Sequence, residues 1–438
     1  MYNVDWAGLL SRTPAAGSAQ PDAPHTGTAR TGPLARIMSP GISRTVWCLG
    51  LTSFFTDVSS EMVASILPIY LVLHLHLSPL TFGLIDGLYQ GFAAVARVAG
   101  GFVADRWRNH KAVASVGYAL SAACKIGMLA AGNAWSLLAL TIALDRTGKG
   151  IRTAPRDALI SLSTARAELA TAFGVHRALD AAGAMLGPLV AFLLFAFLPG
   201  AFDAVFVVSF CIAMIGLGVI LFLVNGPVRA VPEPKAVVTM SSAAALVWMP
   251  GFRGLLLAGG ALGLATVSDS FVFLTLQRQM GFGAAYFPLL YAGVAACNGL
   301  LSIPIGRTAD RLGRWRTFLA GHGLLLLVYL VLVGPGPGML RLIVALLLFG
   351  SYYAATDGVL AAMASAALPP RLCGSGLAVL ATVTNVARLL ASVAFGAIWM
   401  WTGLNNAIVA FAGALVIAIA IARLALRPTD APLDRPVL

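Results

Sequence analysis

Twelve long apolar stretches follow one another along this chain, and they limit what it can fold into. They lie near residues 46–73, 82–104, 112–131, 135–160, 169–197, 203–224, 253–276, 284–306, 317–333, 339–366, 375–401 and 405–424. Each is about long enough to cross a hydrocarbon core of ~30 Å as a helix. Charged residues make up only 11% of the chain, against about 25% in soluble domains. The sequence therefore predicts an all-α integral membrane protein with twelve transmembrane helices.

The longest polar interruption, residues 225–252, separates the first six apolar stretches from the last six. It contains Pro, Lys, Arg and Glu, so we expect a central cytoplasmic loop there. Residues 44–224 and 253–424 are predicted to form an N-terminal and a C-terminal six-helix bundle. Residues 1–43 are rich in Ala, Gly, Pro, Ser and Thr and lack the apolar core of a signal peptide, which predicts a disordered tail. Residues 425–438 are expected to form a second tail.

Basic residues in the short loops set the expected orientation. If the N-terminus is inside, the outer loops carry only Arg278 and Arg341. The inner loops then carry Arg106, Arg108, Lys111, Arg166, Arg229, Lys235, Arg307, Arg311, Arg314, Arg316 and Arg371. Both tails are therefore predicted to be cytoplasmic, in a protein of the inner membrane. These loops also explain the net charge of +12, and no nucleic-acid partner is expected.

The loops after the second and the eighth apolar stretch share a sequence pattern. Residues 101–111 read GFVADRWRNHK, and residues 306–316 read GRTADRLGRWR. Both match G-x-x-A-D-R, and both end in a base at the same offset. Two copies of one six-helix unit are a common way to build a transporter, with the substrate site between them.

With these loops the chain resembles the major facilitator superfamily. The hallmark loop of that family, G-x-x-x-D-(R/K)-x-G-(R/K)-(R/K), fits the second copy, whereas Arg108 replaces the glycine of the first. Two further family patterns occur as Arg146, Gly148 and Gly150 in span four and as Gly183, Gly187 and Pro188 in span five. The resemblance covers about residues 46–424 and implies two six-helix bundles that work by alternating access. In this family the pattern in span five is associated with exporters that run as antiporters.

The repeated loops supply candidate gating residues, namely Asp105, Arg106, Asp310 and Arg311. A carboxylate at such a helix end can pair with loop arginines and with the N-terminus of a neighbouring helix. This pairing would form a latch that closes the cytoplasmic side in one state. The alternative is that the loops only obey the positive-inside rule, which explains the bases but not the aspartates.

Span five supplies three more gating candidates. Gly183 and Gly187 allow two helices to approach closely, and Pro188 interrupts the backbone hydrogen bonds. Plain helix packing and a coupling role explain this pattern equally well.

The fourth apolar stretch carries six charges between residues 145 and 157. Charges at membrane depth are costly, so they normally face a polar cavity or a paired partner. On a helix at ~100° per residue, Asp145, Lys149, Arg152 and Arg156 share an arc of roughly 60°. Arg146 points elsewhere. One charged stripe is therefore predicted on this helix.

The first apolar stretch holds Asp57 and Glu61, which are four residues apart and share a helix face. Two neighbouring carboxylates in a low dielectric do not both stay ionised without cations nearby. In the resembling family, spans one, four, seven and ten line the central cavity. Candidates for substrate binding or proton coupling are therefore eight of the charged residues of these spans: Asp57, Glu61, Asp145, Arg146, Lys149, Arg152, Asp269 and Asp357. The alternative is a fixed salt-bridge network between spans one and four, and the two roles can coexist.

The absent motifs narrow the function. No phosphate-binding G-x-x-x-x-G-K-[ST] loop occurs, so no nucleotide-driven pump is predicted. No nucleophile or metal-ligand pattern is recognisable, so we expect neither an enzyme nor a metal or other cofactor. We predict a monomeric secondary transporter that exports a small polar organic solute, such as a drug, a siderophore or a secondary metabolite, driven by the proton gradient. The alternatives are a proton-coupled uptake symporter or facilitator and a non-transporting membrane sensor.

Overall fold

The structure is a computed structural model of the chain, and it describes residues 43–107, 109–164, 168–224, 247–334, 338–368 and 373–426. These residues form helices and turns, with no strand among them. In chain order the elements are α2 (Arg44–Ile69), η2 (Tyr70–His74), α3 (Pro79–Trp107), α4 (His110–Ala131), α5 (Trp135–Leu162), α6 (Leu169–Phe197), α7 (Phe202–Gly218), η4 (Val219–Leu223), α9 (Pro250–Leu264), α10 (Asp269–Met280), η5 (Ala284–Tyr286), α11 (Pro288–Leu312), α12 (Arg314–Val333), α13 (Met339–Ala367), α14 (Cys373–Thr402) and α15 (Leu404–Ala425). The predicted tails and central loop fall almost entirely outside the described residues.

The lengths and composition of the helices confirm an all-α integral membrane protein. Ten helical segments of the described chain are long and apolar enough to cross a membrane. The helices α3 and α5 have sufficient length, at 29 and 28 residues, but they carry more charges than an ordinary lipid-facing span. When η2, η4 and α10 are joined to the helices that precede them, and η5 to the helix α11 that follows it, the described elements form twelve units of membrane length.

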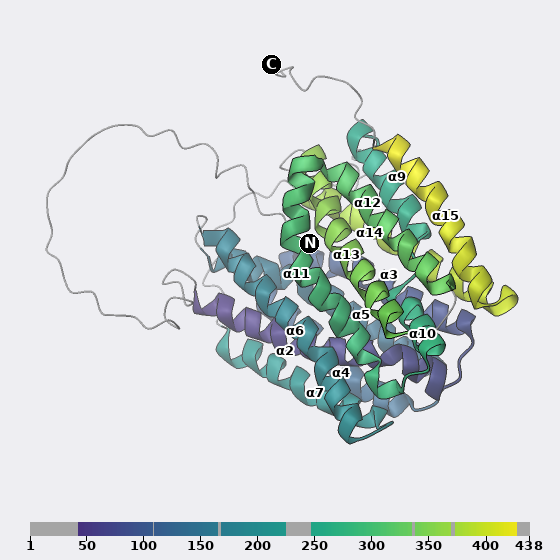
Figure 1. The fold of residues 1–438 in the computed structure, drawn as a ribbon. Helices are drawn as coiled ribbons and strands as arrows, with labels where there is room; N and C mark the ends of the chain where they lie inside the picture. Colours follow the sequence, from purple (N-terminus) through teal and green to yellow (C-terminus); the bar gives the residue numbers. More distant parts are fainter. Residues whose placement is uncertain are drawn as a thin grey trace, which may run out of the picture.

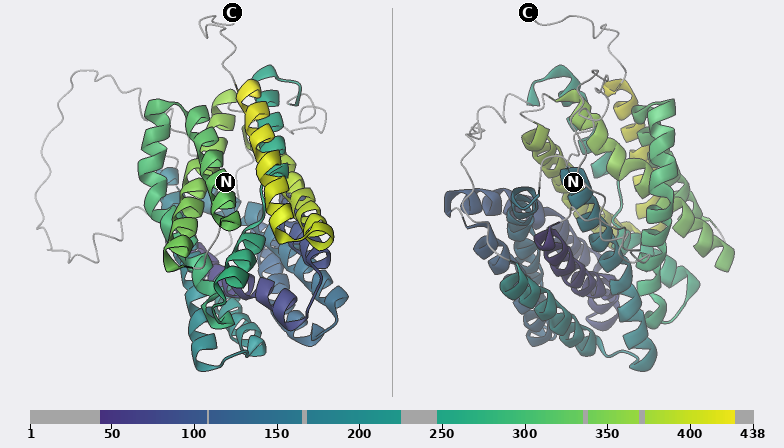
Figure 2. Two further views of the ribbon diagram at one scale, coloured as in Figure 1. Left: turned by 45° about the vertical axis from the view of Figure 1, so that its right-hand side comes forward. Right: turned by 90° about the vertical axis from the view of Figure 1, so that its left-hand side faces the viewer.

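The helices lie in two groups that meet mainly through two pairs of helices (Figures 1 and 2). In the first group α2 packs against α6 and α7, and α4 packs against α5 and α7. In the second group α9 packs against α14 and α15, while α13 packs against α11 and α12. The pairs α3–α14 and α6–α11 join the two groups. The cavity described below lies between these groups.

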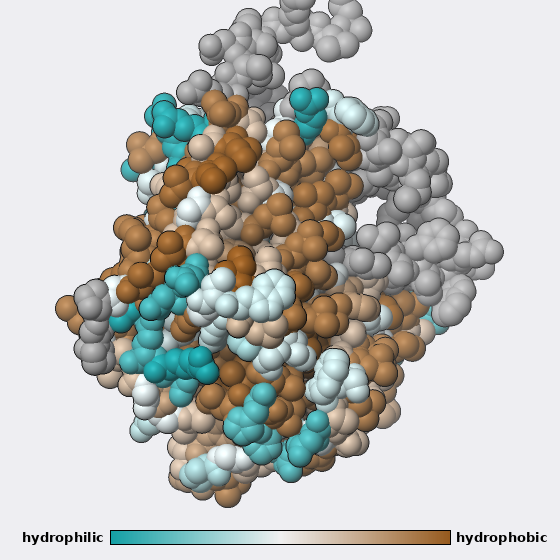
Figure 3. All heavy atoms as spheres, turned by 90° about the vertical axis from the view of Figure 1, so that its right-hand side faces the viewer, coloured by the Kyte–Doolittle hydropathy of each residue, from teal (hydrophilic) through white to brown (hydrophobic). Residues whose placement is uncertain are grey.

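The surface agrees with a membrane environment. Figure 3 shows one face of the molecule, on which apolar side chains form a broad covering. Phe197, Phe222 and Leu300 are each about four-fifths exposed. An apolar surface of this extent would cause aggregation in water, whereas lipid chains solvate it.

The predicted seventh span, 253–276, lies within the membrane-length segment Gly251–Met280, but it is interrupted by a break. The helix stops at Leu264, the backbone is extended at Ser268, and α10 begins at Asp269. Tyr329 of α12 stabilises the break, because its hydroxyl accepts from Val267 N–H at 2.7 Å and donates to the Ala265 carbonyl at 3.1 Å. A side chain distant in sequence thus satisfies backbone groups that the interrupted helix leaves free.

Candidate functional site

A cavity of about 360 Å³ lies between the two groups of helices. Its walls come from α2, α3 and α5 on one side and from α10, α11 and α14 on the other. The polar and charged residues that line it are Glu61, Asp86, Tyr89, Gln90, Arg146, Lys149, Asp269, Ser270, Tyr291 and Asn385. The cavity is therefore polar, carries charges of both signs, and has the size of a site for a small solute.

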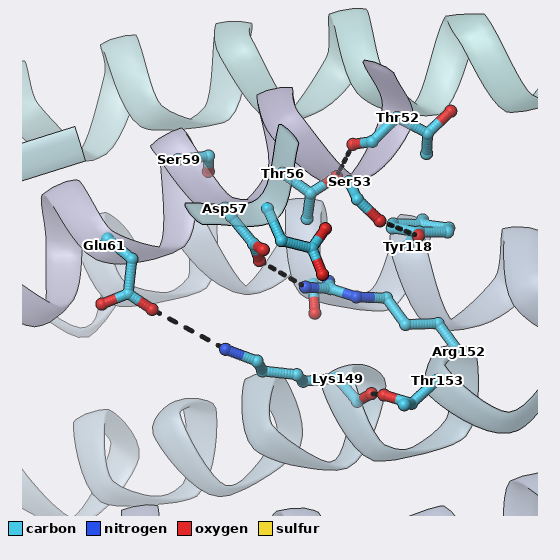
Figure 4. A network of polar contacts seen from close by, with 12 residues as sticks. Thr52, Ser53, Thr56, Asp57, Ser59, Glu61, Tyr118, Lys149, Arg152 and Thr153 are labelled. Atoms are coloured by element: carbon cyan, nitrogen blue, oxygen red, sulfur yellow. Dashed lines mark hydrogen bonds and ion pairs between the residues drawn. The ribbon is translucent and has the colours of Figure 1, made fainter. Parts of the chain in front are cut away.

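The bases of α5 meet polar groups of α2 on three successive turns, and Figure 4 shows the first two of these contacts. Lys149 Nζ lies 3.7 Å from Glu61 Oε1, and Arg152 Nη2 lies 3.7 Å from Asp57 Oδ1. One turn further, Arg156 Nη1 donates to Ser53 Oγ at 3.1 Å. The long side chains bridge the two helices and compensate charges that neither helix could bury alone.

Only one of these three pairs opens into the cavity. The side chains of Lys149 and Glu61 are 35% and 25% exposed, and both line the cavity wall. Arg152, by contrast, is buried and stacks over the ring of Tyr118 at 4.8 Å. The Lys149–Glu61 pair is therefore the one of these three pairs that a solute in the cavity can reach and separate.

Asp145, the first residue of the predicted charged stripe on α5, does not face α2 as the other residues of the stripe do. Asp145 is buried and turned towards α4, where Lys125 Nζ donates to its Oδ1 at 2.9 Å. Arg146 donates to the other carboxylate oxygen through Nε at 3.1 Å. Arg146 also lies over the Tyr89 ring at 4.0 Å and lines the cavity. Asp145 thus fixes the position of the Arg146 side chain on the side away from the cavity, and it does not line the cavity itself.

The second group of helices contributes Asp269, at the break between α9 and α10. Its carboxylate lines the cavity and accepts a hydrogen bond from the Tyr353 hydroxyl of α13. Asp357, one turn further along α13, is half-buried and is not part of the cavity wall among the described residues. Of these two candidates, the structure brings Asp269 to the cavity.

The glycines of α6 act as a close-packing surface for α2. A methyl group on Gly183 would lie 2.6 Å from the Phe54 carbonyl oxygen, and one on Gly187 would lie 2.7 Å from that of Val58. The same methyl on Gly187 would lie 2.9 Å from Glu61 Cβ. This close approach matches the helix-packing interpretation of Gly183, Gly187 and Pro188, and it sets the position of the helix that carries Glu61.

Of the candidate gating residues in the repeated loops, the structure describes the side chains of the second copy only. Asp310 Oδ1, near the end of α11, accepts from Nη2 of the loop arginine Arg314, the first residue of α12, at 3.1 Å. Arg314 also donates to the Ala362 carbonyl of α13 at 3.4 Å. Arg311 is exposed. The side chains of Asp105 and Arg106 lie outside the described part of the structure.

Asp86, Tyr89 and Tyr291 line the cavity but were not among the predicted site residues. Asp86 is the single acidic residue in the first two-thirds of α3, and an acidic residue within an apolar span usually has a function. The sequence did not tell which neighbour it would face, because its partner on α14, Ser392, lies 306 residues away. Lys125 could be suspected on the same grounds, since it is a lone cation in an apolar span.

Comparison with known proteins identifies the family. The sequence model of the Major Facilitator Superfamily matches residues 49–392 and 270–437. The chain belongs to the major facilitator superfamily. As a member of this superfamily it is a transporter rather than an enzyme, and its substrate is a small molecule.

Two relatives of known sequence are similar to this chain, and neither has a named substrate. The chain is 29% identical over 373 residues to an uncharacterised MFS-type transporter of Methanocaldococcus jannaschii, covering 82% of this chain and 89% of that protein. It is also 29% identical over 284 residues to an uncharacterised protein of Mycobacterium tuberculosis, covering 62% of this chain and 66% of that protein.

Solved structures of the superfamily share the fold. The nucleoside transporter NupG, in a mutant form, aligns with a TM-score of 0.75 at 15% identity over 87% of this chain and all of that one. A bacterial homologue of the human lysosomal transporter Spinster aligns with a TM-score of 0.70 at 16% identity, covering 87% of this chain and 96% of that one. At this level of identity the likeness concerns the fold alone.

Proposed function

We propose that this transporter exports a small zwitterionic solute in exchange for protons. The observation that supports this most is the Lys149–Glu61 pair, which is 3.7 Å apart, partly exposed and part of the cavity wall. A zwitterion can separate this pair and replace both partners, since its cationic group binds Glu61 and its anionic group binds Lys149 and Arg146. A neutral or singly charged solute would leave one member of the pair without a partner in a poorly solvated site.

Proton exchange follows from competition at the same carboxylate. A solute cation and a proton cannot both neutralise Glu61, so binding of one favours release of the other. Proton uptake from outside then frees the solute, and proton release inside allows the next solute to bind. Asp57 is held by the buried Arg152, so we assign it a role in supporting the geometry rather than in carrying the proton.

The residues of the repeated loops are proposed to control the cytoplasmic side. Asp310 and Arg314 form an exposed ion pair, which by itself contributes little to stability. Because such a pair is weak, it can break and reform at small cost during each cycle. We propose the same role for Asp105 and Arg106, with both tails in the cytoplasm and the protein in the inner membrane.

Proteoliposomes loaded with a pH-sensitive dye test the direction of coupling. The probes are a panel of amino acids, betaines and dipeptides, together with the methyl esters that lack the carboxylate. For an antiported zwitterion, protons move against the solute flux, and the ester produces no proton movement. Movement of solute and protons in the same direction would establish uptake by symport instead. Solute flux without protons would establish a facilitator, and specific binding without flux would establish a sensor.

The variant Glu61→Gln separates coupling from binding. It resembles the protonated form permanently, so gradient-driven export should stop while solute–solute exchange continues. The matched control is Asp203→Asn, an exposed carboxylate at the start of α7, which should transport like the wild type. Gradient-driven export at the wild-type rate in Glu61→Gln would remove Glu61 from the coupling step.

A further inference from the structure

The helices α3 and α14 are in close contact along their length nearest the start of α3. A methyl group on Gly83 would lie 2.5 Å from the Ser392 carbonyl oxygen, and one on Gly87 would lie 2.9 Å from that of Leu389. Gly396 packs in the same way against the carbonyl of Pro79. We call this contact the outer seam, because the loop arginines predict that this end lies outside. Small residues let the two backbones meet, so the groups are closed against each other here.

Aromatic side chains close the same end. The ring of Phe82 on α3 meets Phe271 of α10 edge-to-face, with centroids 4.9 Å apart. Phe271 in turn contacts Phe395 and Trp399 of α14 at 4.7 and 5.6 Å. Phe82 also lines the cavity, and a smaller pocket lies against Phe82, Phe271 and Trp399. Alternating access requires this seam to separate in the other state.

Asp86 lies within the outer seam, between Gly83 and Gly87. Its side chain is 7% exposed, and Ser392 Oγ of α14 donates to its Oδ2 at 2.7 Å across the seam. The hydroxyls of Ser268 and Ser270, at the start of α10, are close neighbours. Among the described residues no cation forms an ion pair with Asp86, in contrast to Glu61 and Asp57. In the described part of the chain, the hydrogen-bond partner of this carboxyl group is the Ser392 hydroxyl.

The charged and titratable groups that share the cavity wall with Asp86 are Glu61, Tyr89, Arg146, Lys149, Asp269 and Tyr291. The cations among them already have partners: Lys149 faces Glu61, and Arg146 is held by Asp145 and Tyr89. Asp269 adds a second carboxylate beside the seam. Arg388, on α14, belongs to the surroundings of Asp269 and Asp357. The environment of Asp86 therefore offers little compensation for a negative charge.

From this placement we propose that Asp86 is a proton site that controls the outer seam. Closing the seam buries the carboxyl group, and burying a charge without a cation costs several kcal/mol more than burying a neutral group that is hydrogen-bonded. Protonation from outside, while the seam is open, therefore favours closure. Because Asp86 also lines the cavity, the proton can leave to the other side once the cavity opens there.

This inference rests on the proposed coupling to protons, and it does not depend on the nature of the solute. In an exchanger, the protein must return from the outward-open state carrying a proton and no solute. A seam that closes only over a neutral Asp86 enforces that order. Glu61 would then exchange solute for a proton, and Asp86 would prevent the seam from closing before a proton has arrived.

Distances between spin labels can test the gate without any solute. Cysteines at Asn133, in the turn between α4 and α5, and at Thr402, at the end of α14, are exposed and belong to different helix groups. The full chain, with its native cysteines replaced by serine, is measured in lipid nanodiscs from about pH 5.5 to about pH 8; a single linked proton changes the closed-to-open ratio by at most about tenfold per pH unit. The wild type should shift to the longer distance as the pH rises.

Each variant has a different expected pH response of the label distance. Asp86→Asn should remain closed across this range, with a closed-to-open ratio that changes less than about twofold, because the linked proton is lost. Asp86→Glu keeps a titratable group and should restore the pH response, which excludes a general folding defect. Gly87→Ala inserts a methyl group into the seam and should hold it open at all pH values. Asp203→Asn is the control and should respond like the wild type.

Two outcomes would overturn the inference. One is a wild type whose distances do not depend on pH, and the other is an Asp86→Asn variant that keeps the wild-type response. If Glu61→Gln loses the response in that second case, the gating proton lies on Glu61. That last result leaves the proposed proton-coupled export intact. Conversely, failure of the transport assay does not alter the distance measurement, so the two proposals fail separately.

Discussion

The contact between α6 and α2 gives a sharp test of how the cavity residues are positioned. In Gly187→Ala, the new methyl carbon would lie 2.7 Å from the Val58 carbonyl oxygen and 2.9 Å from Glu61 Cβ, whereas ordinary contact begins at 3.4 Å. The two helices must therefore separate by about 0.7 Å at this point. Overpacking of this kind typically costs about 1–3 kcal/mol of unfolding free energy.

The same movement should reach the cavity. Gly187 presses on the backbone of α2 at Met62 and Glu61, so the displaced helix carries Glu61 with it and alters the 3.7 Å pair with Lys149. We expect impaired solute binding in addition to the loss of stability. Reversible unfolding in mixed micelles measures the stability, and equilibrium binding measures the second effect.

Gly174→Ala is the matched control for this prediction. It lies in the same helix, and a methyl group there meets no atom within 4 Å. Its unfolding free energy should stay within about 1 kcal/mol of the wild type, or rise slightly because alanine favours helix over glycine. Equal stabilities of Gly187→Ala and Gly174→Ala would refute the claim that the glycine pattern sets the α2–α6 distance.

Three further predictions concern other parts of the molecule. Asp145→Asn should lower the unfolding free energy by about 3–5 kcal/mol, because it leaves Lys125 buried and unpaired. Lys125→Met should lower it less, since the Asp145 carboxylate keeps Arg146 as its partner. Unfolding in mixed micelles measures which of the two variants is the less stable. Tyr329→Phe should lose about 1–3 kcal/mol in the same assay, because the Val267 N–H loses its acceptor; an unchanged stability would contradict the stated role of the hydroxyl. Reporter fusions at Gly132 should report outside and those at Lys111 inside, and a reversed pair would refute the orientation.

The sequence alone determined the class of fold and the position of most helices. A bilayer core of fixed thickness requires about 20 apolar residues for each crossing, so length and composition suffice to locate spans such as 112–131 and 405–424. The pairing of Asp57 and Glu61 on one face followed from helical periodicity. The repeated G-x-x-A-D-R loops pointed to the superfamily through local sequence, without any knowledge of packing.

The tertiary structure decided which charges meet. Helical periodicity fixes the angle between Asp145 and Arg146 but not the rotation of α5 about its axis, so the sequence could not tell which of them faces the cavity. Contacts with α4 settle it, since Lys125 binds Asp145 and turns it away. The break before Asp269 likewise depends on the hydroxyl of Tyr329.

Asp86 illustrates the same limit most clearly. Local sequence identifies it as the single acidic residue in the first two-thirds of α3, which suggests a function but no partner. Its partner, Ser392, is 306 residues away and reaches it only because glycines let α3 and α14 come into contact. Long-range packing sets how each helix is rotated and how closely it approaches its neighbours, and these two quantities decide whether a charge faces lipid, a partner or the cavity.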